Sequence, residues 1–301
     1  MTKPRPIIKG TTYLLTRRCF QRHYLLGSSP VVNQVFIYCM AVAQKKYGML
    51  VHGLCVMSNH YHLVATDPEG NLPKFMHWLH EFVAKNLNIH YRRRESFWSP
   101  GSYSAVKLAD HGAIVDKLAY TLNNPVSAGL VRSAVRWSGL TSANTNQQRT
   151  WHAKRPHLYF SRRSRLPASA SLQFSPPPGV DAEVFTRELQ IALEQREQTA
   201  LQEREAERRR ARNKRKRRRR RHKVVRHTDA ATTQEPTRHI KPRIACRDPA
   251  LRAEELRLLR EFETEYRTAW LARQRGQEAA VFPYGTYWLA HCQKALPIAS
   301  G

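Results

Sequence analysis

The order of strand and helix patterns in the first 110 residues constrains the fold of this chain more than any other feature. Runs of β-forming residues alternate with apolar repeats of helical period, and Ser29-Pro30 and Gly48 mark the start and end of the first helix. Only Ser58-Asn59 separates the two middle strands, so these strands form a hairpin. The β-α-β-β-α-β order predicts an α+β, ferredoxin-like fold, whose two crossover helices cover one sheet face and leave the other open. The predicted strands are 11–16, 49–57, 60–66 and 102–108. The first predicted helix is 28–48, and the second begins near residue 72 and ends in the basic cluster 92–94.

A third helix is predicted from about Asp110 to Asn123, where Pro125 would stop it. Its apolar residues recur on one stripe, which indicates a packed face. At about 100° per residue, Tyr120 and Asn124 fall roughly opposite that stripe and close to each other. A tyrosine placed only for packing would lie in the stripe, so Tyr120 is either a plain surface residue or a functional one.

Two histidines, His60 and His62, are separated by one residue within the third predicted strand. Residues i and i+2 of a strand point to the same face, so the two imidazoles would lie side by side, opposite the face of Tyr61 and Leu63. The chain has 14 histidines, so a chance pair is easy to find. The apolar residues on the opposite face favour a partial metal site over a merely solvated strand.

The chain is strongly basic, with 51 Lys and Arg residues against 23 Asp and Glu residues and a formal net charge of +28. Residues 208–223 are almost entirely Lys and Arg, and the rest of the chain is also basic. This excess favours a polyanionic partner, with nucleic acid first and an anionic membrane surface second. The scattered cysteines, and the lack of a signal-peptide pattern or a long apolar stretch, predict a cytoplasmic protein without a disulfide framework.

Composition divides the chain into five predicted parts. A compact domain is followed by a polar linker, an Arg/Lys-rich arm that is either one solvated helix or disordered, and a second linker. Asp248-Pro249 then starts an amphipathic helix. The predicted bounds are 1–140, 141–180, 181–227, 228–247 and 248–301.

Two runs resemble the motifs of a known family. Residues 57–64 (MSNHYHLV) resemble the HUH motif of single-strand tyrosine transposases, and residues 118–131 (LAYTLNNPVSAGLV) resemble the tyrosine-helix motif of their REP-associated branch. Together, in this order and spacing, they are specific, and the resemblance covers about residues 4–140. Ser58 departs from the pattern, because many members carry proline there.

The resemblance implies a metal-dependent transferase that cleaves and rejoins single-stranded DNA at hairpin-bearing ends. His60, His62 and Asn124 would be ligands of Mg²⁺ or Mn²⁺. Tyr120 would be the nucleophile, giving a 5′-phosphotyrosine and a free 3′-OH, and Asn59 would have a positioning role only. Because Mg²⁺ prefers oxygen ligands, two imidazoles fit a weak, exchangeable site that accepts Mn²⁺.

Basic side chains are expected to hold the DNA backbone, and Tyr91, Phe97 and Trp98 either stack on bases or belong to the core. The Arg-rich arm would add affinity for phosphate irrespective of DNA sequence, or else only solubilise the chain. The candidate DNA-binding residues are Arg17, Arg18, Arg22, Arg92, Arg93, Arg94, Arg217, Arg218 and Arg219.

Two other functions remain compatible with the sequence. One is a non-catalytic nucleic-acid-binding protein that retains the same fold. The other is a zinc-dependent hydrolase or regulator built on His60 and His62, although no H-E-x-x-H or paired-Cys signature supports it. A homodimer that exchanges tyrosine helices and a monomer that acts in cis fit the sequence equally well.

Overall fold

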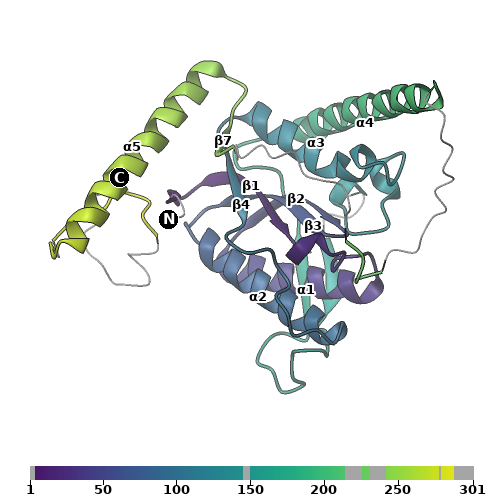
Figure 1. The fold of residues 1–301 in the computed structure, drawn as a ribbon, viewed down its shortest axis with the longest axis horizontal. Coiled ribbons are helices and arrows are strands. Elements are labelled where there is room, and N and C mark those ends of the chain that lie inside the picture. The colour runs from purple at the N-terminus through teal and green to yellow at the C-terminus, as the bar shows by residue number, and fades with distance from the viewer. Residues whose placement is uncertain (1–3, 145–149, 214–225, 231–241, 278, 288–301) are drawn as a thin grey trace.

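The computed structural model describes residues 4–144, 150–213, 226–230, 242–277 and 279–287. Within these ranges a five-stranded sheet lies between two layers of helices (Figure 1). Short 3₁₀ turns and a separate two-stranded hairpin connect the larger elements. The 3₁₀ turns are Phe20–Arg22, Ala134–Arg136 and Ser142–Asn144.

The sheet has the strand order β2-β3-β1-β4-β7. The strands are β1 (Thr11–Arg18), β2 (Leu50–Met57), β3 (His60–Asp67), β4 (Ser104–Leu108) and β7 (Ile244–Ala245). The first four strands pair antiparallel, and β7 adds a short parallel edge to β4. The predicted α+β, ferredoxin-like arrangement is therefore confirmed, while β7 lies in a stretch that had been predicted as a linker.

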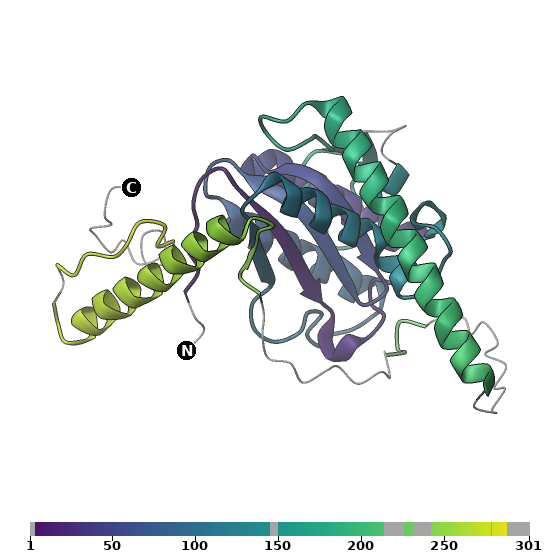
Figure 2. The same ribbon diagram turned by 90° about the horizontal axis from the view of Figure 1, so that it is seen from above.

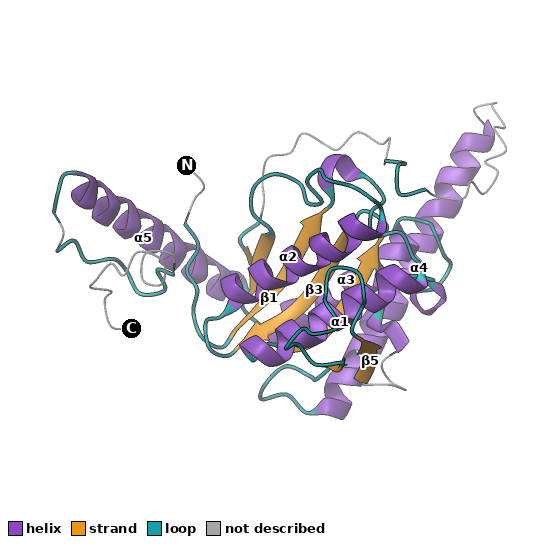
Figure 3. Ribbon diagram, turned by 90° about the horizontal axis from the view of Figure 1, so that it is seen from below, coloured by secondary structure: helices purple, strands orange, loops and turns teal. Residues whose placement is uncertain are grey.

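Helices α1 (Pro30–Tyr47) and α2 (Leu72–His90) cover one face of the sheet (Figure 3). The Ser29 hydroxyl accepts the N–H of Val32 at 3.2 Å and caps α1. Gly48, at φ 69°, ends this helix in the left-handed conformation that glycine adopts without strain. Both predicted signals of the first helix are confirmed. The core under these helices includes the sheet residues Tyr13, Leu15, Tyr61, Leu63 and Ala65.

The opposite face of the sheet is covered rather than open, which corrects the sequence prediction. Helix α3 (His111–Ser127) lies directly on it, and α4 (Ala182–Asn213) packs across α3 (Figure 2). The physical reason is the apolar stripe of α3, which is removed from water only when it meets the sheet. The second core comprises Leu14, Val64, Val106, Leu108, Val115, Leu118, Leu122 and Phe185.

Pro125 lies inside α3, although the sequence predicted that it would stop the helix. A proline so close to the end leaves only one carbonyl, four residues earlier, without its helical partner. The helix closes beyond it, because the N–H of Ala128 donates to the Asn124 carbonyl at 2.9 Å. Asn124 is therefore fixed within the last turn of the helix.

The extensions beyond residue 140 contain more structure than the composition predicted. Strands β5 (Thr150–Lys154) and β6 (Ser169–Gln173) form a hairpin against α1, inside the predicted linker 141–180. The arm is helical as far as Asn213. The hairpin pairs its own backbone and contributes Leu172 and Ala153 to the core, a long-range packing contact that composition does not reveal.

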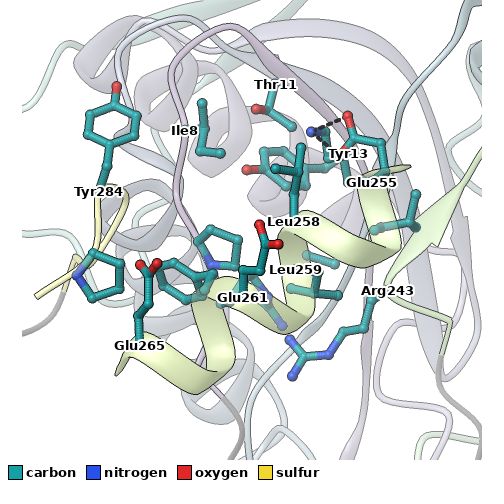
Figure 4. A pocket seen from close by; sticks show the side chains of 17 residues that line it. Ile8, Thr11, Tyr13, Arg243, Glu255, Leu258, Leu259, Glu261, Glu265 and Tyr284 are labelled. Atoms are coloured by element: carbon teal, nitrogen blue, oxygen red, sulfur yellow. Dashed lines mark hydrogen bonds and ion pairs between the residues drawn. The ribbon is translucent and has the colours of Figure 1, made fainter. Parts of the chain in front are cut away.

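Helix α5 (Pro249–Gln274) begins at the predicted cap, Asp248, and projects from the body of the molecule (Figures 1 and 2). Its first turns are tied to β4 by an ion pair between Glu255 and Lys107 at 2.6 Å. A cavity of about 330 Å³ lies between α5 and the strands, bordered by Tyr13 and Leu258 (Figure 4). None of the helices in the described ranges is long and apolar enough to cross a membrane.

Gly53 lets α3 approach the sheet closely, because a Cβ on this residue would lie 2.2 Å from Leu118 Cδ1. We expect Gly53→Ala to lower the free energy of unfolding by about 1–3 kcal/mol, the usual cost of overpacking a core. Urea unfolding measures this. The double variant Gly53→Ala/Leu118→Ala should lose less than the sum of the two single variants, since the second change removes the clashing atom. If the losses in unfolding free energy of the two single variants simply added up in the double variant, this contact would be contradicted.

Candidate active site

The β2–β3 hairpin places His60 and His62 on the sheet face beneath α3. Their ring centroids are 4.9 Å apart, and His62 is only 6 % exposed. Opposite them on β1, in register, lie Arg18 beside His60 and Thr16 beside His62. Cross-strand partners share a face, so these four side chains form one polar group in an otherwise apolar layer.

Each histidine is oriented by a hydrogen bond to its Nδ1 atom. Asn59 Oδ1 lies 2.7 Å from His60 Nδ1, and Thr16 Oγ1 lies 2.8 Å from His62 Nδ1. The Asn59 amide nitrogen donates to the Arg22 carbonyl at 3.3 Å, which leaves Oδ1 as the acceptor and assigns the proton on His60 to Nδ1. Such a bond leaves Nε2 with its lone pair, which is the arrangement that orients a metal-binding imidazole.

Helix α3 brings Tyr120 and Asn124 to the same place. The Asp110 carboxylate accepts the Ala113 N–H at 2.5 Å and starts the helix, and the apolar stripe then sets its rotation on the sheet. The Tyr120 ring centroid lies 5.5 Å from that of His62, and the Asn124 side chain is hydrogen-bonded to His60. Tyr120 remains 39 % exposed, so a large substrate can reach it.

All four residues that the resemblance implied for the site meet within one chain. The arrangement offers two imidazole nitrogens and one amide at a shared position, next to a phenol. Across the described ranges, no group of three His, Cys, Asp or Glu side chains converges as a metal site. The donor set is therefore mixed, and it fits a weakly held divalent ion that tolerates imidazole better than it fits a closed zinc site.

Burial keeps both histidines neutral near pH 7. It lowers the pKa of His60 to about 4, with a further contribution from the positive charge of Arg18, against the opposing hydrogen bond of Asn124. Burial, followed by the neighbouring His60 and Arg18, holds the pKa of His62 well below its usual range. A neutral imidazole is the form that binds a metal ion, so neither residue needs to lose a proton first.

These lowered pKa values make folding sensitive to acid. His60 and the buried His52 both have a pKa of about 4 in the folded chain, below the ordinary value near 6.5. Below pH 6.5 the unfolded chain therefore binds protons that the folded chain does not, and stability falls as the pH drops from 6.5 towards 4. We expect a lower urea midpoint at pH 5 than at pH 7.5.

The matched control is His152→Ala, which removes an exposed histidine from β5 and should leave this pH dependence unchanged. His52→Gln should reduce it, because His52 is held between the Ser175 carbonyl at 2.8 Å and the Thr66 hydroxyl at 2.7 Å. Equal midpoints at the two pH values, or a higher one at pH 5, would contradict this reading.

The predicted DNA-binding arginines separate into two groups. Arg18 is exposed beside the histidines, and Arg22 also acts electrostatically on His60. Arg17 instead points to the other face, where it donates to the carbonyls of Gly101 at 2.7 Å and Ser99 at 3.0 Å. The alternation of side chains along β1 explains this difference between neighbours.

The second basic cluster belongs to the α2 side of the molecule. Arg93 pairs with Glu95 at 3.7 Å, and Arg94 lines a groove together with Arg17 and His77, while Arg92 is exposed. The structure therefore does not bring Arg92, Arg93 and Arg94 to the histidine face. Phe97 and Trp98 are 2 % and 7 % exposed and belong to the core, as does the partly buried Tyr91. Arg217, Arg218 and Arg219 lie outside the described residues.

Sequence reasoning missed two residues of this region. Thr16 was only part of a strand pattern, and its role depends on the register between β1 and β3. Arg196 of α4 lies with its Cζ atom 6.0 Å from the Tyr120 ring centroid. Its sequence signal was present, because it falls in the helical stripe of Phe185, Leu189 and Leu193.

Residues 9–116 match the family model of IS200-like transposases. The chain is therefore similar to this family over that stretch, which confirms the resemblance noted in its sequence. The match includes His60 and His62 and ends four residues before Tyr120. No curated protein matches the chain.

Two solved structures are similar to parts of this chain. One is a REP-associated tyrosine transposase bound to a REP hairpin, with 17 % identity and a TM-score of 0.40 over 46 % of this chain and 81 % of that chain. The other is a putative transposase from Deinococcus radiodurans R1, with 21 % identity and a TM-score of 0.28 over 37 % of this chain and 89 % of that chain. Both alignments cover less than half of this chain.

Proposed function

We propose that this transposase domain cleaves and rejoins single-stranded DNA through a covalent phosphotyrosine on Tyr120. The observation that carries the proposal is the meeting of Tyr120 with His62, 5.5 Å between ring centroids, from two elements far apart in sequence. A phenol next to two neutral, oriented imidazoles provides the groups that phosphoryl transfer to a side chain needs. A hydrolytic nuclease would use water and would need no tyrosine.

The bonds that form and break in this reaction all belong to the DNA and the Tyr120 side chain. The phenol loses its proton to solvent, its oxygen bonds to phosphorus, and the bond from phosphorus to the 3′-oxygen breaks. That oxygen takes up a proton to become a free 3′-OH, while the strand that begins with the 5′-phosphate stays attached to Tyr120. The exchange conserves one phosphodiester bond, so a second 3′-OH can reverse it and join a new strand.

His60, His62 and Asn124 would hold a divalent ion, Mg²⁺ or Mn²⁺, during this reaction. Such an ion supplies Lewis-acid polarisation of the phosphate and screens its charge. The chain's own contribution is orientation: Asn59 and Thr16 fix the rings through their Nδ1 atoms, and α3 fixes the amide and the phenol. Arg18, exposed beside His60, is placed to neutralise a phosphate.

We infer that the substrate is a hairpin-bearing single strand of the REP-associated type. The motif resemblance over residues 118–131 supports this, and so does the exposure of Tyr120 on a basic protein. The single chain contains every proposed site residue, so action in cis is sufficient. A homodimer that exchanges tyrosine helices is the alternative assembly.

Incubation of the full chain with a labelled hairpin strand and Mn²⁺ tests the proposal. A protein–DNA adduct that survives a denaturing gel is the expected result. Tight binding without an adduct under Mn²⁺ or Mg²⁺ would overturn it in favour of a non-catalytic binding protein. Stoichiometric zinc in the purified chain would instead point to the metal-binding regulator.

A further inference from the structure

Helix α4 packs against α3 through a stripe of side chains that includes an arginine at its centre. Phe185, Leu189, Leu193 and Ala200 provide the apolar part of this stripe. Arg196 occupies the helical position between Leu193 and Ala200, and its side chain is 34 % exposed. A half-buried charge in a packing stripe is costly unless it is paired, so its presence calls for an explanation.

Arg196 contacts two residues of α3 at once. Its guanidinium forms an ion pair with the Asp116 carboxylate, and its Cζ atom lies 6.0 Å from the centroid of the Tyr120 ring. Asp116 and Tyr120 are four residues apart on the same helix, so their side chains lie on one face and a single guanidinium spans both. Arg196 thus links the extension α4 directly to the proposed nucleophile.

The Asp116 carboxylate has more than one cationic partner. Lys117 Nζ lies 2.9 Å from it and Arg247 lies 3.7 Å from it, in addition to Arg196. Burial raises the pKa of Asp116, but the hydrogen bonds from Lys117 and Arg196 outweigh it and lower the pKa. Asp116 therefore stays ionised and anchors Arg196 without cancelling the positive charge of the whole group.

The position of α4 on α3 does not depend on Arg196 alone. Glu197, the next residue, accepts the backbone N–H of Ala134 at 2.6 Å and the Ser133 hydroxyl at 3.2 Å. The apolar stripe continues on both sides of this point. A conservative change at Arg196 is therefore expected to leave α4 in place, which makes its effect on Tyr120 measurable.

We propose that Arg196 is a positioning residue for Tyr120: anchored on Asp116, its guanidinium restrains the phenol ring in its place beside His62. This inference rests on the proposed role of Tyr120 as the nucleophile. A cation close to the face of an aromatic ring attracts the ring and so limits its movement. Arg196, which lies outside the range that the family model matches, therefore contributes to the site.

The test uses the full chain with 3-fluorotyrosine incorporated at position 120, observed by ¹⁹F NMR at a single pH. Arg196→Gln should broaden or shift the signal, because the ring loses the cation beside it, whereas Arg196→Lys should keep the signal close to that of the parent. In chains with natural tyrosine, Arg196→Gln should slow adduct formation roughly 10-fold, and Arg196→Lys should recover most of this loss. Arg187→Gln, at an exposed position on α4, is the matched control.

Failure of this inference and failure of the proposed function give different results. An unchanged ¹⁹F signal in Arg196→Gln, with an adduct rate equal to that of the parent, overturns the role of Arg196 and leaves the phosphotyrosine reaction intact. A changed ¹⁹F signal in a chain that forms no adduct supports the contact between Arg196 and Tyr120 and overturns the reaction. Equal urea midpoints for the parent and both Arg196 variants show that the effect is local to Tyr120, and loss of adduct in Arg196→Lys equal to that in Arg196→Gln would contradict a role of the charge.

Discussion

Tyr120→Phe should abolish covalent attachment of the chain to DNA. The change removes one oxygen atom from a residue that is 39 % exposed, so folding and DNA affinity should remain close to those of the parent. Removing the nucleophile of a group-transfer enzyme lowers its rate by several powers of ten, and we expect a loss on the order of 10³-fold or more. Quantifying the adduct on denaturing gels over time, together with DNA affinity, measures both effects.

The matched control is Tyr159→Phe. Tyr159 is 43 % exposed and lies against Phe82 on the α2 side of the molecule, so the same atom is deleted away from the proposed site. Adduct formation should be unchanged in this variant. Full adduct formation by Tyr120→Phe would assign the nucleophile to another residue.

The second large effect is expected from the two histidines. His60→Ala and His62→Ala each remove one of the proposed metal-binding nitrogens, and we expect the affinity for Mn²⁺ to fall by roughly 100-fold or more. Adduct formation should fall with it and recover in part at high Mn²⁺ concentration. Titration followed by electron paramagnetic resonance measures the free Mn²⁺ directly.

A variant at Thr16 separates the orientation of the His62 ring from the binding of the metal ion by that ring. Thr16→Val keeps the shape of the side chain but removes the hydroxyl that lies 2.8 Å from His62 Nδ1, and a loss of roughly 10-fold in Mn²⁺ affinity is expected. His152→Ala, at an exposed position on the β5–β6 hairpin, should have no effect. Unchanged Mn²⁺ binding in both His60→Ala and His62→Ala would show that the pair is structural.

The elements up to residue 110 were predictable because their signals are local. Ser29-Pro30 and Gly48 start and end α1 as expected, and the alternation around His60 and His62 correctly assigned their common face. The closeness of Tyr120 to Asn124 also followed from helical spacing alone. Each of these inferences depends on residues within a few positions of one another.

What escaped prediction depends on contacts between distant segments. The prediction of an open sheet face was wrong, because the apolar residues of α3 and of the first half of α4 are buried on that side of the sheet. Alternation along β1 puts Thr16 and Arg17 on opposite faces of the sheet, but only the register between β1 and β3 places Thr16 beside His62. Arg196 meets Tyr120 across 76 positions of sequence, through a helix that composition presented as a solvated arm.

The central claim is a covalent bond between Tyr120 and DNA phosphate, and mass spectrometry of the trypsin-digested adduct tests it most directly. Cleavage after Lys117 and Arg132 isolates Tyr120 as the only tyrosine of the peptide 118–132. We predict that this peptide carries the mass of the 5′-nucleotide remnant, with the modification on Tyr120. An adduct mapped to any other peptide, or an unmodified 118–132 peptide in a chain that retains the DNA, would contradict the account.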